Sequence, residues 1–465
     1  MFVLQSRWKP EGGSLYYYGL RNKEHMFRNC VRLNRRQRAV IEALPCELTP
    51  AQKRSLGSLL GVQVVEEKMV RRVPKSLSEA RFCTTCCAND FIIPGLEFDG
   101  EGRCPMCQTA HETRTLKSVV PLVTQLTRAK KSRFDVAVFY TGGKDSTFLL
   151  YHLAKVLGLR VLALTWEIPY ISPHAKASIE GAKKAFPNVE FLVRTVSADD
   201  LRRVYCKLLE LSANTCACPS LAYVLFYPEL VANRVPYFAT GNEPVQMLGL
   251  YYNHLAPRIA YSFADNRFLQ AIVNLGRLVT LHPPLRRGQL HTLMTMKQLA
   301  YGDHPLKKMS GYRSELVSNV VTAIHEVPAF LPPLRRCIRS SSFTGHIPAF
   351  VQFDLDAACG GTYDWNKVRD ILLGECGWVP PPDDGKALHT SCSIERCKDR
   401  SQFLRFYNCE SKMIPFSAIE ISLASRNCGR SREEMMYEIE HLLGFSLEEL
   451  PECALMRGWA EQTPQ

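Results

Sequence analysis

The 465-residue chain contains one segment, Phe134-Asp-Val-Ala-Val-Phe-Tyr-Thr-Gly-Gly-Lys-Asp-Ser146, that indicates its architecture more clearly than any other. The first half of this segment is rich in β-branched and aromatic residues, which predicts a buried strand. The two glycines permit a tight turn, and residues 146–157 then carry apolar side chains at helical spacing. A strand, a Gly-rich loop and a helix N-terminus in this order bind phosphate, because free N–H groups and the positive end of the helix dipole meet the anion.

The loop at 141–146 is neither a Walker A loop nor the dinucleotide fingerprint. It resembles the S-G-G-x-D-S signature of the PP-loop ATP pyrophosphatases, with Thr141 in place of the first serine. The threonine keeps the hydroxyl group of that serine. This resemblance implies an enzyme that cleaves ATP between the α- and β-phosphates and activates a carbonyl as its adenylate. The alternative is an ordinary strand-to-helix turn of a Rossmann-like domain.

The resemblance also implies a role for each loop residue. Backbone N–H groups of the glycines and the hydroxyls of the threonine and serine would hold the phosphates that leave as pyrophosphate. The lysine and a magnesium ion would offset the developing negative charge. Asp145 is a better candidate for the magnesium ligand than Glu243, because it offers a hard oxygen inside the loop, beside the phosphates. The residues expected to bind ATP here are Thr141, Gly142, Gly143, Lys144, Asp145 and Ser146, and the last three are also expected to be catalytic.

Strand-like and helix-like segments alternate after this loop as far as about residue 280. Strands are expected at 161–166, 189–195 and 235–241, and helices at 174–185, 198–211 and 221–232. This alternation predicts an α/β fold with a doubly wound parallel sheet, of the HUP-like kind, whose ligand lies at the carboxyl ends of the strands.

Two strand ends therefore provide further candidates for the site. Thr165 and Trp166 end the second strand and are expected to meet the nucleoside, although Trp166 would serve equally as a core aromatic. Gly241 and Glu243 follow the last strand of the series, near the expected phosphates. Glu243 would hold magnesium or orient a substrate, or else cap the next helix.

Four of the eighteen cysteines have the spacing of metal ligands. Cys83, Cys86, Cys104 and Cys107 form two C-x-x-C pairs, which is typical of a zinc ribbon with four thiolate ligands. A structural zinc is expected, because all four positions are filled. The neighbouring Cys87 is a spare thiol that makes the exact ligand set ambiguous.

A second group is Cys216-Ala-Cys218. In PP-loop sulfur-transfer enzymes, cysteines at a comparable stage of the chain carry persulfide sulfur or hold an iron–sulfur cluster. A cluster needs further thiolates, for which Cys206 is a candidate. The alternative is a set of ordinary buried thiols.

Composition and charge narrow the class of protein. The chain has no apolar run long enough for a membrane span and no secretory signal pattern at its start, so a soluble cytoplasmic protein is expected. The net charge of +13 fits a nucleic-acid partner or an enzyme for phosphorylated compounds. Nucleic-acid binding is the less favoured of the two, since the basic residues are scattered.

Changes in the sequence pattern, together with proline-rich stretches, suggest four parts of the chain. We expect a small N-terminal α+β module at 1–80, similar to a winged helix, and a zinc ribbon at 81–112. A PP-loop domain is expected at 130–280, followed at 281–465 by an insertion and a C-terminal substrate region. Capping-box spacing at Ser431 and Ser446 predicts the starts of the last two helices.

Beyond the loop itself, the chain resembles the bacterial N-acetyl sugar amidotransferases over about residues 81–450. The resemblance rests on a four-cysteine ribbon directly before the PP-loop, on Tyr363-Asp-Trp365 and Gly377-Trp378, and on the stretches 418–425 and 429–434. It implies that ammonia from a partner glutaminase is installed on an ATP-activated sugar amide or acid.

The sequence thus favours an ATP-dependent adenylating enzyme that releases pyrophosphate and AMP and transfers nitrogen to a carbonyl, amide or acid acceptor. The alternative is a sulfurtransferase that uses Cys216 and Cys218 and a sulfur-donor partner to thiolate a tRNA, a peptide or a small molecule. A third interpretation is a non-enzymatic, ATP-gated nucleic-acid binder. The expected cofactors are ATP, Mg²⁺ and Zn²⁺, with an iron–sulfur cluster as a further candidate.

Overall fold

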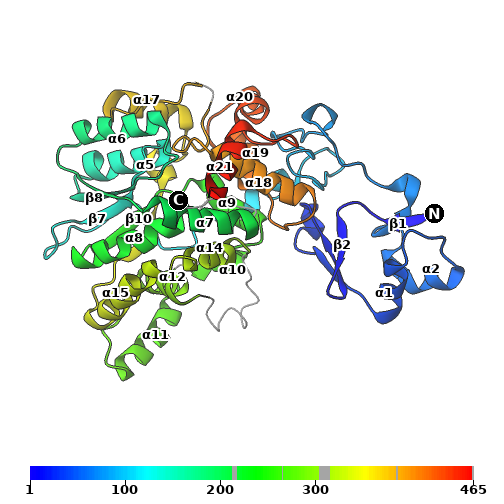
Figure 1. Ribbon diagram of the computed structural model, residues 1–465, viewed down its shortest axis with the longest axis horizontal. Coiled ribbons are helices and arrows are strands. Elements are labelled where there is room, and N and C mark those ends of the chain that lie inside the picture. Colours follow the sequence, from blue (N-terminus) through cyan, green and yellow to red (C-terminus); the bar gives the residue numbers. More distant parts are fainter. Residues whose placement is uncertain (212–216, 264, 303–314, 384–385, 463–465) are drawn as a thin grey trace.

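The centre of the molecule is a six-stranded sheet in which every neighbouring pair of strands is parallel (Figure 1). The computed structural model describes residues 1–211, 217–263, 265–302, 315–383 and 386–462. The strand order is β6-β11-β10-β7-β8-β9. The strands are β6 (Leu122–Val123), β7 (Val136–Phe139), β8 (Val161–Trp166), β9 (Glu190–Arg194), β10 (Tyr237–Thr240) and β11 (Ala349–Phe353). The predicted parallel α/β sheet is confirmed.

Helices cover both faces of this sheet, because successive side chains of a buried strand point to opposite sides. Val136 and Val138 of β7 pack into one core with Phe148 of the following helix. Ala137 lies in a different core with Phe226. The first face carries α5 (Lys144–Tyr151), α6 (Pro173–Ala185) and α17 (Trp365–Glu375), and the opposite face carries α8 (Cys218–Ala232), as Figure 1 shows. A π-helical turn over His152–Val156 extends α5.

Two strands of the sheet come from outside the stretch in which alternation was predicted. Strand β11 inserts between β6 and β10, although it lies beyond residue 281. All five of its residues are buried. A five-residue run that is apolar except for Gln352 does not distinguish a strand from a buried helical turn, so the pattern alone did not reveal it.

The N-terminal part has its own small core, formed by Leu15, Val40 and Leu56 among others. Its antiparallel sheets are β2 (Trp8–Glu11), β3 (Ser14–Tyr17) and β4 (Cys30–Arg32) in one and β1 (Phe2–Leu4) with β5 (Val64–Glu66) in the other. Its helices are α1 (Arg35–Glu42) and α2 (Pro50–Leu56), and Thr49 caps the second. This part lies at one end of the molecule in Figure 1.

Four α-helices form the C-terminal part of the described chain. They are α18 (Glu395–Tyr407), α19 (Phe416–Asn427), α20 (Arg432–Tyr437) and α21 (Pro451–Glu461). Ser431 caps α20 through a capping box, as predicted. The same prediction at Ser446 is wrong. The Ser446 hydroxyl accepts a hydrogen bond from the Glu448 amide at 3.1 Å, which closes a local turn, and the last helix begins only at Pro451.

The other α-helices lie around these elements. They are α3 (Pro105–Gln108), α4 (Ala110–Thr113), α7 (Ala198–Leu211), α9 (Pro244–Tyr252), α10 (Arg258–Phe263), α11 (Arg267–Val279), α12 (Gln289–Tyr301), α14 (Glu315–His325), α15 (Leu331–Thr344) and α16 (Leu355–Ala358). None of the helices in the described ranges has both the length and the apolar composition that crossing a bilayer requires.

Candidate functional site

The Gly-rich loop lies where the winding of the sheet reverses direction. From β7 the chain proceeds to β8 and β9 on one side, whereas β10 and β11 lie on the other side. Residues 141–143 follow β7 and residues 241–243 follow β10, so two adjacent parallel strands end at the same edge. This is the topological switch point, at which open α/β sheets bind their ligands.

Gly142 is required by the geometry of the turn. Its φ angle is +72°, and a Cβ atom on it would lie 2.3 Å from the carbonyl oxygen of Ala175. Its own carbonyl oxygen accepts a 3.2 Å hydrogen bond from the indole N–H of Trp378. The loop backbone is therefore held from two sides, and a side chain at this position would displace it.

The N-terminus of α5 follows this loop and is also in contact with a segment far along the chain. Gly143 is the N-cap of α5. The amides of Gly143 and Lys144 each donate a 3.4 Å hydrogen bond, to the hydroxyls of Thr141 and Thr390 respectively. The hydroxyls of Thr141 and Ser146 lie 3.2 Å apart. Two amides and two hydroxyls thus gather at a helix N-terminus, which is the donor set that suits an anion.

A cavity of about 260 Å³ lies against the loop and the neighbouring strand end. Of the sequence-predicted residues, Thr141, Gly143, Lys144, Asp145, Ser146 and Gly241 line it. The rest of the lining is Phe139, Leu149, Pro219, Tyr223, Ala239, Thr240, Asn242, Gln246, Ala387, His389, Thr390 and Ser391. The structure therefore brings the two predicted strand ends together and adds a wall from residues 387–391.

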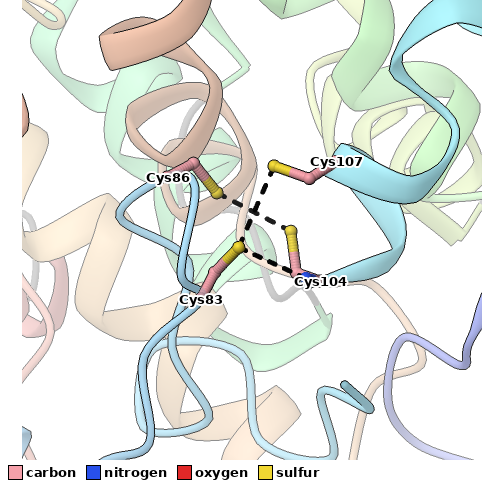
Figure 2. Close-up of side chains that lie close together, drawn as sticks. All are labelled: Cys83, Cys86, Cys104 and Cys107. Carbon is pink, nitrogen blue, oxygen red and sulfur yellow. Dashed lines mark hydrogen bonds between the residues drawn. The ribbon is translucent and has the colours of Figure 1, made fainter. Parts of the chain in front are cut away.

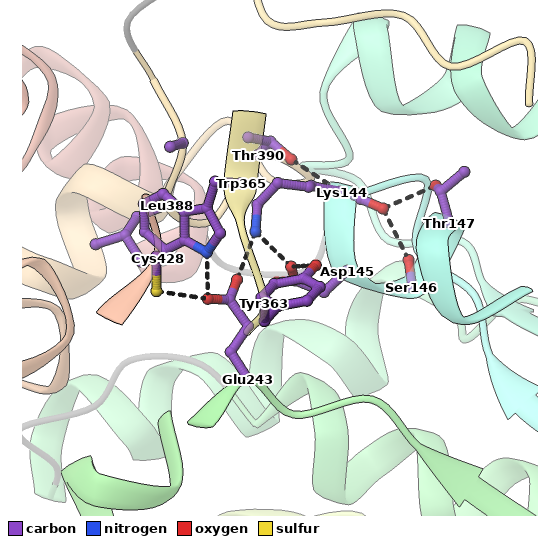
Figure 3. A network of polar contacts seen from close by, with 12 residues as sticks. Lys144, Asp145, Ser146, Thr147, Glu243, Tyr363, Trp365, Leu388, Thr390 and Cys428 are labelled. Atoms are coloured by element: carbon purple, nitrogen blue, oxygen red, sulfur yellow. Dashed lines mark hydrogen bonds and ion pairs between the residues drawn. The ribbon is translucent and has the colours of Figure 1, made fainter. Parts of the chain in front are cut away.

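Lys144 is the centre of a buried polar network (Figure 3). Its Nζ lies 2.6 Å from Asp145 Oδ1 and 2.6 Å from Glu243 Oε1. The Tyr363 hydroxyl donates to the same Asp145 oxygen at 2.7 Å, and the Trp365 indole N–H donates to Glu243 Oε2 at 2.6 Å. The ammonium also lies 4.9 Å and 4.4 Å from the centres of these two aromatic rings, within the range of a cation–π interaction.

The ionisable groups of this network have pKa values that are shifted in different directions. Burial by itself lowers the pKa of Lys144, but the two carboxylates outweigh it and raise that pKa. Burial and the negative charge of Asp145 raise the pKa of Glu243 well above its ordinary value, against the pull of Lys144. Burial would also raise the pKa of Asp145, but Lys144 holds it below the usual range. Asp145, which lines the cavity, is therefore the carboxylate that stays ionised.

Sequence reasoning assigned no role at the site to Tyr363, Trp365 and Trp378. All three lie more than 200 positions from the loop, and no periodicity connects them to it. A local signal did exist. Buried Tyr and Trp side chains need partners for their O–H and N–H groups. Aromatic residues beside a polar one, as in residues 363–365, are therefore candidates for a polar network.

Another part of the cavity wall carries a partly buried histidine. His389 Nε2 lies 2.8 Å from Glu420 Oε2, and Glu420 is itself buried in α19. Burial lowers the pKa of His389, but Glu420 and, more weakly, Glu395 raise it against the opposing effect of Lys398, to about 9. At neutral pH, His389 is thus an imidazolium that faces the same cavity as the loop.

Four predicted residues lie beside the cavity rather than in its lining. The Thr165 hydroxyl is buried and donates to the carbonyl oxygen of Tyr140 at 3.0 Å. Trp166 is half-buried at the end of β8. Glu243 is the N-cap of α9, while its carboxylate contacts Lys144 and Trp365 as described above. Gly142 contributes its conformation, as shown above.

Of the second cysteine group, Cys216 lies outside the described residues. Cys218 is the first residue of α8, and its Sγ lies 3.4 Å from the Tyr205 hydroxyl. The next residue, Pro219, lines the cavity. Cys206 donates to the carbonyl oxygen of Ala460. Among the residues that the structure describes, neither Cys206 nor Cys218 belongs to a group of three or more side chains that could hold a metal ion.

The four predicted ribbon cysteines do converge (Figure 2). Their sulfur atoms all lie within 4.8 Å of one another, with 3.9 Å between Cys83 and Cys107 and 3.6 Å between Cys86 and Cys104. The Cys87 sulfur instead contacts the Ser425 hydroxyl, which resolves the ambiguity of the ligand set. This four-cysteine group could hold zinc or an iron–sulfur cluster, and it is consistent with a zinc ribbon.

Helix α19 connects the four-cysteine group to the cavity. Near its end, the Arg426 guanidinium donates to the Cys107 sulfur at 3.5 Å and to the Met106 carbonyl oxygen at 3.1 Å. Glu420, earlier in the same helix, contacts His389 in the cavity wall. The ribbon therefore supports one wall of the cavity through a single buried helix.

Comparisons with known proteins add little to this geometry. No model of a protein family matches the chain, and no curated protein matches it. Among solved structures, it is similar to the U34-tRNA thiolase NcsA from Methanococcus maripaludis with its 4Fe–4S cluster. That similarity has 15% sequence identity and a TM-score of 0.23, and it covers 56% of this chain and 86% of the thiolase chain. At this score it carries no argument about the chemistry of the present site.

Proposed function

We propose that this protein is an ATP-dependent adenylating enzyme that releases pyrophosphate. The observation that carries the proposal is the loop at 141–146, whose amides and hydroxyls gather at the N-terminus of α5 beside a cavity at the switch point of the sheet. The resemblance of this loop to the PP-loop supplies the reaction class.

In the first half-reaction, the loop would bind the leaving pyrophosphate. The amides of Gly143 and Lys144 now make only long hydrogen bonds to hydroxyls, and phosphate oxygens would offer them better acceptors. Lys144 is the first residue of the same helix, carries a positive charge and lines the cavity. Asp145 is the residue that would hold the magnesium ion that accompanies ATP, and this ion would neutralise phosphate charge.

The bonds change in two steps. The carbonyl or carboxylate oxygen of the acceptor attacks the α-phosphorus, and the bond from this phosphorus to the α–β bridging oxygen breaks. Pyrophosphate leaves with that electron pair, and the acceptor becomes an adenylate. A nucleophile then adds to the activated carbon, and AMP leaves. His389 faces the cavity as a cation and would stabilise negative charge on the acceptor during this exchange.

The nucleophile of the second step is nitrogen or sulfur, and each has support. Nitrogen is supported by the residues that carry the resemblance to sugar amidotransferases, because Tyr363, Trp365 and Trp378 all bind the loop network. Sulfur is supported by Cys218, which lies next to the cavity-lining Pro219 at a helix N-terminus, a position that favours a thiolate.

We also propose that the metal in the four-cysteine group is zinc. Four thiolates around one zinc, with bonds of about 2.3 Å, lie about 3.8 Å apart, which agrees with the sulfur separations of 3.9 Å and 3.6 Å. A cluster with four iron atoms between the sulfurs would separate them further. The zinc would be structural, with no open position for a substrate.

The adenylation proposal is tested with ATP labelled at the α-phosphate, incubated with magnesium, the purified protein and a small-molecule extract as the source of acceptor. We expect the label in AMP, with pyrophosphate as the second product. Gly142→Ala should lower this turnover about 100-fold, because a displaced loop no longer aligns the phosphates. Gly374→Ala in α17 is the matched control, since a Cβ there meets no atom within 4 Å. Label in ADP would contradict the proposal.

The double substitution Cys216→Ser with Cys218→Ser distinguishes nitrogen transfer from sulfur transfer. If nitrogen is transferred, most product formation should remain. If sulfur is transferred through these thiols, product should disappear while AMP release continues, because the thiol acts only after the adenylate exists. Mass analysis of the product after incubation with isotopically labelled glutamine or cysteine gives an independent answer.

A further inference from the structure

Helix α11 presents the wrong face to the solvent. In most surface helices the apolar face is buried and the polar face is exposed to solvent. Here Phe268, Ile272, Leu275 and Val279 form one stripe along the helix, and their side chains are 76%, 52%, 67% and 79% exposed. In Figure 1, α11 lies at the lower edge of the molecule with no other element beyond it.

The polar face of α11 is turned toward the protein and is fully used there. Gln270 and Asn274 both donate to the carbonyl oxygen of Leu285, at 2.7 Å and 3.0 Å. The Arg277 guanidinium donates to the carbonyl oxygens of Pro283 and Ser342, at 2.8 Å and 2.9 Å. These bonds fix the rotation of the helix about its axis, so the outward apolar stripe is a consequence of specific contacts.

The stripe has the spacing of a coiled-coil seam. Its four residues are separated by four, three and four positions, which corresponds to the d, a, d and a sites of successive heptads. Two further exposed apolar residues, Leu281 after the helix and Phe343 on α15, enlarge the surface. A patch of this kind on a soluble protein marks an interaction site.

The sequence of the stripe is complementary to itself when read in reverse. About a two-fold axis near the centre of the helix, Phe268 faces Val279 of a second helix and Ile272 faces its Leu275. In each of these pairs, a large side chain thus faces one of equal or smaller size. Leu269 likewise faces Leu278, and the two smallest exposed residues, Ala271 and Gly276, face each other. A two-fold interface requires such self-complementarity, because each contact occurs twice.

Electrostatics favour the same arrangement. Helix α11 contains no acidic residue, and its one basic residue away from the buried face is Arg267 at the N-terminus. In an antiparallel pair, each Arg267 lies beside the C-terminal end of the partner helix, where the helix dipole is negative. A parallel pair would instead bring the two arginines together.

We propose that α11 is a homodimerisation helix, which pairs antiparallel with α11 of a second copy of this chain. A helix of 13 residues is about 20 Å long. A single pair of helices of this length is a small contact beside a standard interface of roughly 800 Å² per partner. We therefore expect a dimer that dissociates on dilution, and association is measured over a range of concentrations.

The proposal is tested by sedimentation equilibrium of the full chain between about 1 and 100 μM. The mass of the wild type should rise with concentration from 52.7 kDa toward twice that value. Ile272→Glu alone and Leu275→Lys alone should each weaken association at least tenfold, because each buries two unpaired charges. Leu455→Glu on α21 is the matched control, an equally exposed leucine outside the patch, and should leave the mass unchanged.

An equimolar mixture of the two charged variants identifies the geometry. In an antiparallel pair, Glu at 272 of one chain meets Lys at 275 of the other, so the mixture should regain the dimer. A parallel pair offers no such contact. A wild type that stays monomeric, or a mixture that stays dissociated, would overturn the proposal. So would a monomer that binds phosphatidylglycerol vesicles through this stripe, since the occupant would then be lipid.

Discussion

At the scale of single residues, the site depends on a lysine held between two carboxylates. Lys144 lies 2.6 Å from both Asp145 and Glu243, and of these two carboxyl groups Asp145 is the one that stays ionised beside it. Burial makes such charges costly unless each has a partner. Tyr363 and Trp365 supply the remaining hydrogen bonds, which is why the arrangement needs large aromatic donors rather than any apolar residue.

His389 provides a prediction at this scale. Its pKa is raised to about 9 in the folded protein, against about 6.5 for a free histidine. A raised pKa means that the folded state binds the proton more tightly, so the stabilisation is complete below pH 6.5 and disappears as the pH rises through 9. The free energy of unfolding should therefore fall by about 3 kcal/mol over this interval.

The measurement is urea unfolding at a series of pH values. Glu420→Gln removes the carboxylate that raises this pKa, so its stability should no longer fall in the same interval. His441→Gln is the control, because this histidine is half-exposed and lies away from the cavity lining. An identical pH profile for the wild type and Glu420→Gln would show that the ion pair contributes nothing.

At the scale of elements, helix α19 relates the four-cysteine group to the cavity. It is buried along most of its length and contacts Cys107 near one end and His389 earlier in its sequence. A change in the ribbon should therefore reach the cavity through the position of this helix rather than through a shared ligand.

The corresponding prediction concerns the metal. Elemental analysis of protein purified without chelator should find one zinc per chain. Cys104→Ser should abolish it and lower the thermal unfolding midpoint, because metal binding contributes folding free energy in small ribbons. Cys87→Ser is the matched control, since its sulfur contacts Ser425 and lies outside the four-sulfur group. Iron in place of zinc, or metal retained in Cys104→Ser, would contradict the assignment.

At the scale of the whole molecule, segments from distant parts of the chain meet at one loop. Residues from β7, β10, the 363–365 turn and the 387–391 segment surround the cavity or its network. The N-terminal part is attached to the rest through Arg7, whose buried guanidinium donates to the carbonyl oxygens of Phe406 and Tyr407 at 2.6 Å. Through α18, this contact joins the first residues to the C-terminal helices.

Local patterns in the sequence determined much of this protein. The strand at 136–139, the turn at Gly142, the helix that follows and the pairing of Cys83 and Cys86 with Cys104 and Cys107 all depend on residues close together in the chain. Strand periodicity, the conformational freedom of glycine and the spacing of metal ligands act over a few residues, so they can be read without knowing the fold.

Only the tertiary structure decided the partners of Lys144, the insertion of β11 into the sheet and the outward apolar face of α11. Trp365 and His389 reach the site from far along the chain, and nothing in their local sequence encodes that meeting. Glu243 was expected near the site because it follows a strand, but its contact with Lys144 became visible only in the folded structure. The apolar stripe of α11 would by itself predict a buried face. The hydrogen bonds of Gln270, Asn274 and Arg277 turn it outward, because long-range contacts override local amphipathicity once polar groups find partners in the folded protein.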